Sequence, residues 1–515
     1  MQTVEKTTPA KDMKLFYACF VALVTTSFGF ILRAIILPEW GTQFNLTQTQ
    51  LGEIAGVGLW PFAISIVLFS LIIDKIGYKT ALIFAFVCHV ASAILTIFAD
   101  GYWMLYAGTF IVALGNGTVE AVVNPVVATM FPREKTKWLN MLHAGWPGGL
   151  VLGGIIALLM GADTRWEYKI GLILLPTLAY GIMMISRKFP LNERVQAGVS
   201  YKEMLQEVGA IGALIIVSLI VFQLGAVFNW STIFNVILIL VVTVAFGMYT
   251  RSLGKPLFII LLLIMIPLAT TELGTDSWIT DLMTPAMNDL SLQAGWILVY
   301  TSAIMFVLRF FAGPIVHKVS PLGLLAICSG IAAVGLYMLS MSAGVMILVA
   351  ATIYGLGKTF FWPTMLGVVA EQFPKGGALT LNITGGLGMI AAGVIGAGTL
   401  GFIQDKTVDS NISAYDKANN TAIHSTYVTE KKTSVFGSYQ AIDQNKLATA
   451  SKEDNMAVTN IRDAAKKDAL KYIVIFPLIM LASYLLLIFY FRSRGGYKAV
   501  VLNDGVRAQP LQTNY

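Results

Sequence analysis

Long apolar segments recur along almost the whole chain, and they constrain its fold more than any motif does. A helix that crosses a membrane needs about 20 mostly apolar residues. Because 56% of the residues are hydrophobic and only 12% are charged, the chain lacks the polar surface of a water-soluble globule. A disordered chain, a secreted disulfide scaffold and a nucleic-acid module are excluded for the same reason. The sequence predicts an all-α polytopic membrane protein with fourteen spans: 14–38, 51–73, 80–99, 102–130, 138–162, 169–186, 208–227, 231–249, 256–274, 293–315, 322–342, 344–370, 378–403 and 470–491.

The positions of the basic residues predict how these helices are oriented. Cytoplasmic loops of membrane proteins are enriched in Lys and Arg. If the N-terminus lies inside, the inward loops and ends hold twenty of the 35 basic residues, whereas the short outward loops hold only Arg165 and Lys169. The net charge of +7 therefore mostly reflects topology, and no nucleic-acid partner is expected. The three cysteines lie in apolar segments, so neither disulfides nor a metal site is predicted.

Two pairs of loop motifs indicate an internal repeat. Lys75 follows the second span and Lys318 follows the tenth, 243 positions later. A Phe-Pro-basic turn with Pro132 closes the fourth span, and a similar turn with Pro374 closes the twelfth, 242 positions later. In both turns an asparagine follows the proline at the eighth position. Two landmarks with nearly the same offset predict duplicated halves of six spans each.

The repeat also predicts the domain organisation. Residues 1–186 form an N-terminal six-helix bundle, 187–255 a cytoplasmic linker with two extra membrane helices, and 256–515 a C-terminal six-helix bundle. An inserted pair of helices keeps the orientation of the second half, which a single extra helix would invert. The polar outward loop 404–468 is expected to be irregular, with an amphipathic helix from Asp454 to Lys471 that leads into the last span. A linker is the expected role of this loop, with an external cap over the cavity as the alternative. Duplicated halves around a midplane site are typical of secondary transporters.

Short motifs add a resemblance to a known family. Residues 74–79, Asp-Lys-Ile-Gly-Tyr-Lys, are similar to the loop after span two of the major facilitator superfamily, although Ser70 stands where that motif usually begins with Gly. Residues 117–125, in which an acid precedes Asn-Pro, resemble the span-four signature of fucose-permease-like sugar symporters. Residues 271–279 resemble their seventh-span region. The resemblance implies two six-helix bundles and proton-coupled sugar transport, with no enzyme activity and no cofactor.

The first span departs from this family pattern. The family has an acid shortly before Leu-Pro, whereas the present chain has Arg33 close to that place, ahead of Leu37 and Pro38. The departure argues against strict fucose transport. Three roles stay open for Arg33: binding an anionic group of the substrate, pairing with Glu120, or reaching the outer membrane interface.

Glu120 is the first candidate for proton coupling. Ionisable residues inside membrane spans are costly and usually functional. Asn116, Glu120 and Asn124 follow each other at spacings of four, which places them on one face of a helix. Because burial disfavours a charged carboxylate, Glu120 can take up and release a proton; a fixed ion pair is the alternative. Glu272, in the segment that resembles the seventh span, is the second proton-coupling candidate.

The twelfth predicted span carries a similar polar face. Tyr354, Lys358 and Trp362 are also spaced by four. Lys358 is expected either to donate hydrogen bonds to a sugar or to pair with Glu120 or Glu272. Trp362 beside it is a candidate stacking platform for a sugar ring, with ordinary packing as the alternative.

The remaining candidates fall into two groups. For His143 a structural role competes with titration near pH 6.5. The full set of predicted substrate-binding residues is Arg33, Asn116, Asn124, Asn140, His143, Trp146, Trp278, Tyr354, Lys358, Trp362 and Asn382. The predicted gating-loop residues, with a conformational rather than a substrate-binding role, are Asp74, Lys75, Arg309, His317 and Lys318.

The sequence thus predicts a secondary active transporter that imports a sugar or sugar-like solute together with protons, sodium not being excluded. An organic anion such as a sugar acid, bound by Arg33 and Lys358, is the alternative substrate. The expected partners are the small-molecule substrate, protons and the lipid bilayer, and the expected state is a monomer. The expected location is the cytoplasmic (inner) membrane of a bacterium, with both termini cytoplasmic. A membrane enzyme, a sensor and a channel are less consistent with the sequence.

Overall fold

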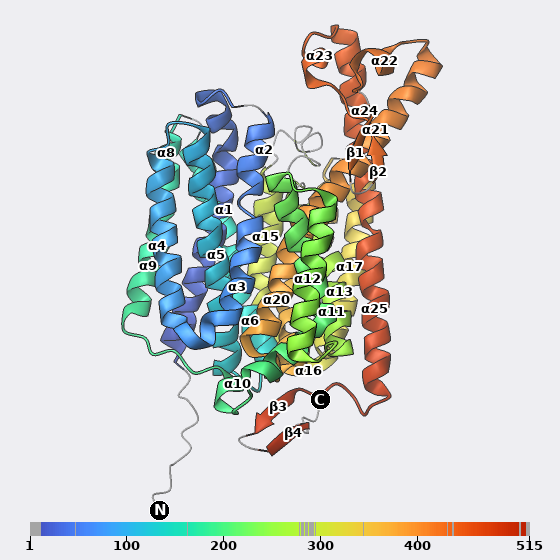
Figure 1. Ribbon diagram of the computed structural model, residues 1–515. Coiled ribbons are helices and arrows are strands. Elements are labelled where there is room, and N and C mark those ends of the chain that lie inside the picture. The colour runs from blue at the N-terminus through green and yellow to red at the C-terminus, as the bar shows by residue number, and fades with distance from the viewer. Residues whose placement is uncertain are drawn as a thin grey trace, which may run out of the picture.

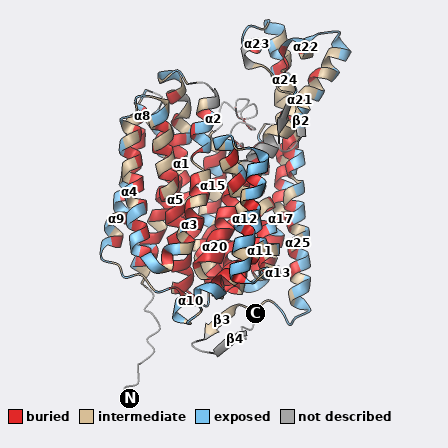
Figure 2. Ribbon diagram, viewed as in Figure 1, coloured by how far each residue is buried: buried red, intermediate tan, exposed pale blue. Residues whose placement is uncertain are grey.

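The computed structural model describes residues 12–46, 48–161, 163–277, 279, 283, 287, 293, 295–342, 344–429, 431–434, 437–503 and 506–510. Its helices run mostly parallel to one long axis (Figure 1). We call the end at which α1 begins and α25 ends the terminal face, and the opposite end the distal face. Buried residues fill the interior of the helix bundle and exposed ones cover its outside (Figure 2).

In the described part of the chain, the first bundle consists of nine helices. They are α1 (Met13–Gln43), α2 (Gln48–Gly56), α3 (Trp60–Ile76), α4 (Tyr78–Ile97), α5 (Tyr102–Met130), α6 (Lys135–His143), α7 (Gly145–Met160), α8 (Trp166–Gly171) and α9 (Leu174–Ile185). The central helix α5 is buried over most of its length and packs against α3, α4 and α1. It approaches α3 so closely that a Cβ on Gly117 would lie 2.2 Å from the Phe62 carbonyl oxygen.

A short linker helix and two inserted helices follow the first bundle: α10 (Glu193–Gln196), α11 (Tyr201–Phe228) and α12 (Thr232–Thr250). Ser200 and Glu203 form a capping box that starts α11. Helix α11 contacts α12, α13 and α20, whereas most side chains of α12 are exposed on the outside of the bundle. The inserted pair therefore packs mainly on the second bundle.

The second bundle is more irregular than the first. Its elements are α13 (Pro256–Ala269), the π-helix η1 (Thr270–Gly274), α15 (Gly295–Arg309), α16 (Ala312–Val319), α17 (Pro321–Met341), α18 (Met346–Lys358), α19 (Phe361–Gln372), the 3-10 helix η2 (Pro374–Gly376), α20 (Gly377–Ile390), the π-helix η3 (Ala391–Ala397) and α25 (Ile475–Arg492). The two bundles meet where α3 contacts α20, α7 contacts α15 and α6 contacts α19.

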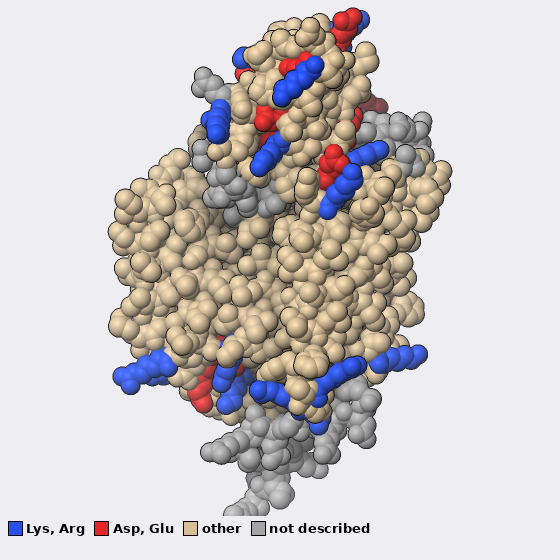
Figure 3. Space-filling model, turned by 90° about the vertical axis from the view of Figure 1, so that its right-hand side faces the viewer, with Lys and Arg blue, Asp and Glu red and all other residues tan. Residues whose placement is uncertain are grey.

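The helical membrane architecture predicted from the sequence is confirmed. In the described parts of the chain, twelve helices are long and apolar enough to cross a membrane, and α15 with α16, bent by 67°, makes a thirteenth. The predicted span 378–403 is helical as α20, η3 and the start of α21 but is not among these thirteen. On the face shown in Figure 3, Lys and Arg border the terminal face, and a wide belt above them lacks charged side chains.

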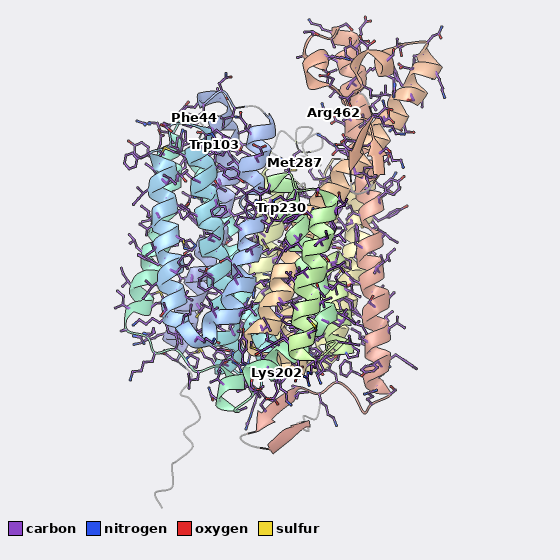
Figure 4. The ribbon with its side chains drawn as sticks, viewed as in Figure 1. Phe44, Trp103, Lys202, Trp230, Met287 and Arg462 are labelled. Atoms are coloured by element: carbon purple, nitrogen blue, oxygen red, sulfur yellow. The ribbon has the colours of Figure 1, made fainter. Side chains whose placement is uncertain are left out.

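Polar and aromatic side chains mark the two ends of this belt. Lys202 lies at the terminal face, whereas Trp103 and Phe44 lie near the distal end of the first bundle (Figure 4). The side chain of Trp103 is exposed. Tryptophan is enriched at membrane–water interfaces and Lys in cytoplasmic loops, so both positions agree with a bilayer around the helices.

The expected helix from Asp454 to Lys471 is present within the helix Lys452–Ile473, whereas the expectation that 404–468 is otherwise an irregular linker is wrong. The segment is part of a small folded protrusion built from α21 (Gly398–Asn419), α22 (Ile423–Tyr427), α23 (Gln444–Ala448), α24 (Lys452–Ile473) and the antiparallel strands β1 (Lys432–Ser434) and β2 (Gly437–Tyr439). Helices α21 and α24 pack against each other around apolar residues that include Ile412 and Val458. The protrusion rises on the side of α25 and does not extend across the first bundle (Figure 1).

The polypeptide after α25 returns along the terminal face. It forms a two-stranded hairpin of β3 (Val500–Asn503) and β4 (Val506–Pro510), drawn below the bundle in Figure 1. Strand β3 contacts η2 and α19. The Tyr497 hydroxyl donates a hydrogen bond of 2.8 Å to Glu371 Oε2, which fixes the start of this tail against the end of α19.

Candidate functional site

A cavity with an empty volume of about 310 Å³ lies between the two bundles. The first bundle contributes polar and aromatic side chains from α5, α6 and α7, and the second contributes residues of η1, α15, α19 and α20. The lining residues are Glu120, His143, Trp146, Glu272, Leu273, Arg309, Trp362 and Met389. The cavity thus brings together five of the predicted substrate-binding and proton-coupling residues: Glu120, Glu272, His143, Trp146 and Trp362.

Glu120 is held by a polar trio on the first bundle. Asn124 Nδ2 donates a hydrogen bond of 2.6 Å to Glu120 Oε2, and Asn124 Oδ1 lies 2.8 Å from His143 Nε2. With the amide in this orientation its oxygen needs a donor, so His143 carries its hydrogen on Nε2. His143 Nε2 lies 4.0 Å from Glu120 Oε2. Within the described residues, no Lys or Arg nitrogen comes within 4.0 Å of the buried Glu120 carboxylate.

Glu272 has a different environment although it lines the same cavity. Its Oε1 accepts a hydrogen bond of 3.0 Å from Arg309 Nη2, and both side chains are almost fully buried. Its Oε2 accepts a hydrogen bond of 3.2 Å from the backbone N–H of Trp362, at the start of α19. A helix N-terminus and a guanidinium both stabilise a negative charge. The surroundings of Glu272 therefore favour a carboxylate.

Arg309 lies in the cavity wall, which corrects its assignment to a gating loop. Helix α15 ends at Arg309, and the chain then bends by 67° into α16, so the side chain stays inside the bundle. Besides Glu272, Arg309 donates to the carbonyl oxygens of Thr359, at 2.7 Å, and His143, at 2.6 Å. His143 belongs to the first bundle, so Arg309 joins the two bundles at the cavity.

The predicted common face of Tyr354, Lys358 and Trp362 is not continuous. Helix α18 ends at Lys358 and α19 begins at Phe361, so Trp362 lies on a separate helix and faces the cavity, which Lys358 does not line. The expected pairing of Lys358 with Glu120 or Glu272 is also wrong. The buried Lys358 forms an ion pair with the half-buried Asp276, which lies one turn after Glu272.

Two further contacts fix this ion pair beside the cavity. Lys358 Nζ lies 3.4 Å from Thr301 Oγ1 and 5.0 Å from the centre of the Tyr354 ring. The Tyr354 hydroxyl donates a hydrogen bond of 2.7 Å to the Thr271 carbonyl oxygen. Sequence reasoning missed Asp276, although its spacing of four from Glu272 on a membrane helix could have identified it.

Arg33 lies away from the cavity, inside the first bundle. Its Nη2 donates a hydrogen bond of 2.8 Å to Ser92 Oγ on α4, and its Nη1 donates one of 3.3 Å to the Gly29 carbonyl oxygen. Its side chain is buried, so it does not reach the outer interface, and it is not among the residues within 4.0 Å of Glu120. The pairing with Glu120 and the interfacial position considered for Arg33 are therefore not found.

Three predicted asparagines occupy other positions. Asn116 belongs to a network inside the first bundle, where its Oδ1 lies 3.0 Å from His89 Nε2. Asn140 and Asn382 instead lie between the bundles: Asn140 Nδ2 donates to Thr364 Oγ1 at 3.1 Å, and Asn382 Nδ2 donates to the Ala121 carbonyl oxygen at 3.0 Å. Trp278 lies outside the described residues.

The predicted loop residues lie at the terminal face. Asp74 forms an ion pair with Arg194 of α10, and Lys75 Nζ lies 5.7 Å from the centre of the Tyr201 ring. His317 Nε2 lies 3.6 Å from Glu134 Oε1 of the other bundle, and Lys318 is exposed. These contacts place the loop with Asp74 and Lys75 next to the linker, and the loop with His317 next to the first bundle.

A buried hydrogen-bonded contact between the bundles at this face was missed from the sequence. Glu371 Oε1, at the end of α19, accepts hydrogen bonds from the Thr136 hydroxyl at 2.6 Å and from the Thr136 N–H at 3.1 Å. The buried Lys135 Nζ forms an ion pair of 2.6 Å with Glu193 and donates to the Ala370 carbonyl oxygen at 3.2 Å. Glu371 stands three residues before Pro374, and Thr136 stands four residues after Pro132. Their closeness to the two matched prolines was the signal that the sequence offered.

Comparisons with known proteins agree with this architecture. The structure resembles the Major Facilitator Superfamily transporter FucP in an outward conformation, with a TM-score of 0.55, 14% identity and coverage of 90% of this chain and 98% of that one. It also resembles the proton:xylose symporter XylE, with a TM-score of 0.60, 11% identity and coverage of 93% and 95%. At these identities the likeness concerns the fold.

Sequence relatives match a shorter stretch. A gentisate transporter of Corynebacterium glutamicum is 24% identical over 176 residues, which are 33% of this chain and 38% of that protein. The chain thus aligns with well under half the length of this relative. The family model described as Major Facilitator Superfamily, by contrast, matches residues 18–393. Because this match covers most of the chain and agrees with the fold, the protein belongs to the Major Facilitator Superfamily.

Proposed function

We propose that the protein is a proton-coupled symporter that carries a sugar or sugar-like polar solute by alternating access, with Glu120 as the proton-binding group. One observation carries the proposal: two buried carboxylates line one cavity, and only Glu272 has a cation and a helix N-terminus beside it. Of the two acids predicted for proton coupling, Glu120 is therefore the one we assign to the proton.

The physical argument concerns the cost of an unpaired charge. A buried carboxylate without a cation partner is strongly disfavoured unless it takes up a proton. In the described residues, the Glu120 carboxylate is hydrogen-bonded to Asn124 and lies 4.0 Å from His143. When the bundles separate and water enters, the carboxylate can be hydrated and release its proton. Proton binding is thereby linked to closure of the cavity.

The cavity lining supports a polar solute that carries a ring. Trp146 comes from the first bundle and Trp362 from the second, and both line the cavity beside polar groups. Aromatic side chains offer apolar faces on which a ring can stack, while carboxylates and a guanidinium offer hydrogen bonds. The name of the structural neighbour XylE, a proton:xylose symporter, agrees with a sugar.

Replacing Glu120 by Gln tests the proposal in proteoliposomes. Labelled D-xylose and L-fucose are the first probes, followed by a wider panel of neutral sugars. A charge moving down about 100 mV supplies about 2.3 kcal/mol, so one proton per solute supports accumulation of about 50-fold. Because Gln resembles the protonated acid, Glu120→Gln should lose proton-driven accumulation and keep counterflow exchange.

A matched control separates coupling from general damage. Glu53 is an exposed acid of α2 near the distal face, so Glu53→Gln should accumulate solute as the unchanged protein does. Uphill uptake by Glu120→Gln in an imposed proton gradient would contradict the assignment. Repeating the gradient with sodium in place of protons tests which cation drives the wild-type protein.

A second candidate function is transport of an organic anion. The gentisate transporter among the relatives is named for an organic acid, and Arg309 presents a guanidinium to the cavity. In this alternative Arg309 takes the place that the sequence assigned to Arg33, and the neighbouring Lys358 adds a second positive charge. Competition for labelled uptake by neutral sugars and by their acid forms distinguishes the two solute classes. If Arg309→Gln left the affinity for the acid forms unchanged, the anion alternative would fail.

We also propose how the protein sits in its membrane. The terminal face, with its Lys and Arg side chains, is taken as cytoplasmic and the protrusion as external, in the cytoplasmic membrane of a bacterium. The division into residues 1–186, 187–255 and 256–515 is supported by the packing of α11 against α13 and α20. A monomer suffices for this mechanism because the cavity lies within one chain.

A further inference from the structure

Arg309 lies in the cavity between its ion-pair partner Glu272 and the first bundle, to which Glu120 belongs. It shares the cavity lining with Glu120 and Glu272. Its guanidinium is ion-paired with Glu272 and donates to the backbone oxygen of His143, whose ring lies 4.0 Å from Glu120. The guanidinium therefore contacts the second bundle through a carboxylate and the first bundle through a neutral carbonyl.

The balance of charge in the cavity depends on one proton. With Glu120 protonated, Arg309 and Glu272 form a neutral pair. With Glu120 ionised, two carboxylates line the cavity beside one guanidinium, and the nearby His143 ring directs its Nε2 to Asn124 Oδ1. Coulombic attraction at short range is strong in a poorly solvated site, so the second carboxylate competes for Arg309.

This competition would reach the start of α19. Glu272 is bonded at one oxygen to Arg309 and at the other to the Trp362 N–H. Arg309 also holds the Thr359 carbonyl oxygen, in the break between α18 and α19. A guanidinium drawn toward Glu120 weakens its hydrogen bonds to Glu272 and to the Thr359 carbonyl oxygen. It also changes the hydrogen bond by which the second bundle contacts the His143 carbonyl oxygen.

We infer that Arg309 is the positioning residue that transmits the protonation state of Glu120 to the packing of the two bundles, by being shared between Glu120 and Glu272. This inference rests on the proposed function in that it takes Glu120 as the proton-binding acid. It goes further in naming the residue through which proton binding changes the conformation. The role requires no contact between Arg309 and the transported solute.

The Lys169–Glu39 pair provides a matched control. It also joins a buried cation to a carboxylate, at 2.6 Å, and it connects α8 to α1 within the first bundle. Neither partner lines the cavity that holds Glu120. Neutralising this pair therefore removes the same amount of charge without touching the connection between Glu120 and α19.

The test measures the separation of the bundles in the absence of any solute. Nitroxide labels replace Ile76, at the end of α3, and Val319, at the end of α16, both exposed at the terminal face. The three native cysteines are buried and are replaced to give a clean background. Double electron–electron resonance in lipid nanodiscs then gives the distance distribution at about pH 6 and about pH 9, a range in which perturbed carboxylates can titrate.

The labelled parent protein, with its cavity unchanged, should show a pH-dependent shift in the distribution of distances between the two labels. Glu120→Gln should abolish this shift. The double variant Arg309→Gln/Glu272→Gln should also be independent of pH, although Glu120 is still present. The control double variant Lys169→Gln/Glu39→Gln should respond as the parent does.

Each other outcome overturns a defined part of the inference. A full pH response in Arg309→Gln/Glu272→Gln shows that Arg309 does not transmit it. A response that survives Glu120→Gln refutes Glu120 as the titrating group and with it the proposed proton site. An absent response in the parent refutes the coupling itself, while the transport assay still tests symport separately.

A conservative variant guards against misfolding of the double variant. Arg309→Lys keeps one positive charge beside Glu272 but cannot make all three contacts of the planar guanidinium. It should fold and show a reduced pH response. An undiminished response in Arg309→Lys would contradict a role for the contacts to His143 and Thr359.

Discussion

Asp416 shows how a single side chain fixes a turn of the protrusion. Its carboxylate accepts hydrogen bonds from the Thr421 hydroxyl at 2.6 Å and from the Ile423 and His424 N–H groups at 3.0 and 2.8 Å. Partial burial acts to raise the pKa of Asp416, but these hydrogen bonds outweigh it and lower the pKa below its ordinary value. A lowered pKa in the folded state stabilises the turn at pH values above the unfolded pKa, and this stabilisation is lost as the pH falls through the folded pKa.

Hydrogen exchange should therefore show α22 opening more readily in acid. The Ile423 and His424 amides should lose protection, relative to their intrinsic rates, below about pH 4. In Asp416→Asn the protection should be weaker at neutral pH and nearly independent of pH. The control Asp463→Asn, on α24, should behave as the unchanged protein does. Equal acid sensitivity in Asp416→Asn would refute this role.

At the same scale, Glu120 and Glu272 show what the sequence could and could not predict. Both are acids within membrane spans, and that fact alone identified them as candidates. Their different roles depend on Arg309 and on the start of α19, which are distant in sequence and are brought near by the fold. The partner of Lys358 could not be predicted either, because the break after α18 turns Trp362 and Lys358 toward different surroundings.

At the scale of elements, close helix packing carries much of the first bundle's stability. Helices α1 and α7 contact each other along their length, and a Cβ on Gly149 of α7 would lie 2.5 Å from the Val24 carbonyl oxygen of α1. Backbone cannot move aside as a flexible side chain can. Gly149→Ala should therefore lower the free energy of unfolding by about 1–3 kcal/mol, the usual cost of overpacking.

Thermal unfolding of the purified protein in detergent checks this prediction. Gly52 of α2 is the matched control, because a Cβ there would meet nothing within 4 Å. Gly52→Ala should leave the midpoint unchanged or raise it slightly, since alanine restricts the unfolded chain. Equal midpoints for the two variants would show that α1 and α7 can separate without cost.

Element boundaries reveal where the sequence pattern fails. Hydropathy identified the long helices because a bilayer demands about 20 apolar residues from each. It could not show that the predicted span 293–315 bends by 67° after Arg309, because the residues on both sides of the bend are apolar. It also missed the fold of 404–468, where a small core that includes Ile412 and Val458 forms from widely spaced residues.

For the whole molecule, the decisive feature is that the two matched Phe-Pro turns lie on one side. The structure agrees at short range, since Glu371 and Thr136, which flank these turns, are hydrogen-bonded to each other. We expect a membrane-impermeant maleimide to label Arg133→Cys and Lys375→Cys in inverted vesicles but not in intact cells. Lys417→Cys, on α21 of the protrusion, should show the opposite pattern.

The three positions together test orientation and duplication separately. If all three patterns are reversed, the bundle is intact but inserted the other way, and the terminal face is external. If Arg133→Cys and Lys375→Cys react from opposite sides, the halves do not share one orientation. In that case the contact between Thr136 and Glu371 could not exist in the membrane, and a cavity between two like-oriented bundles would lose its basis.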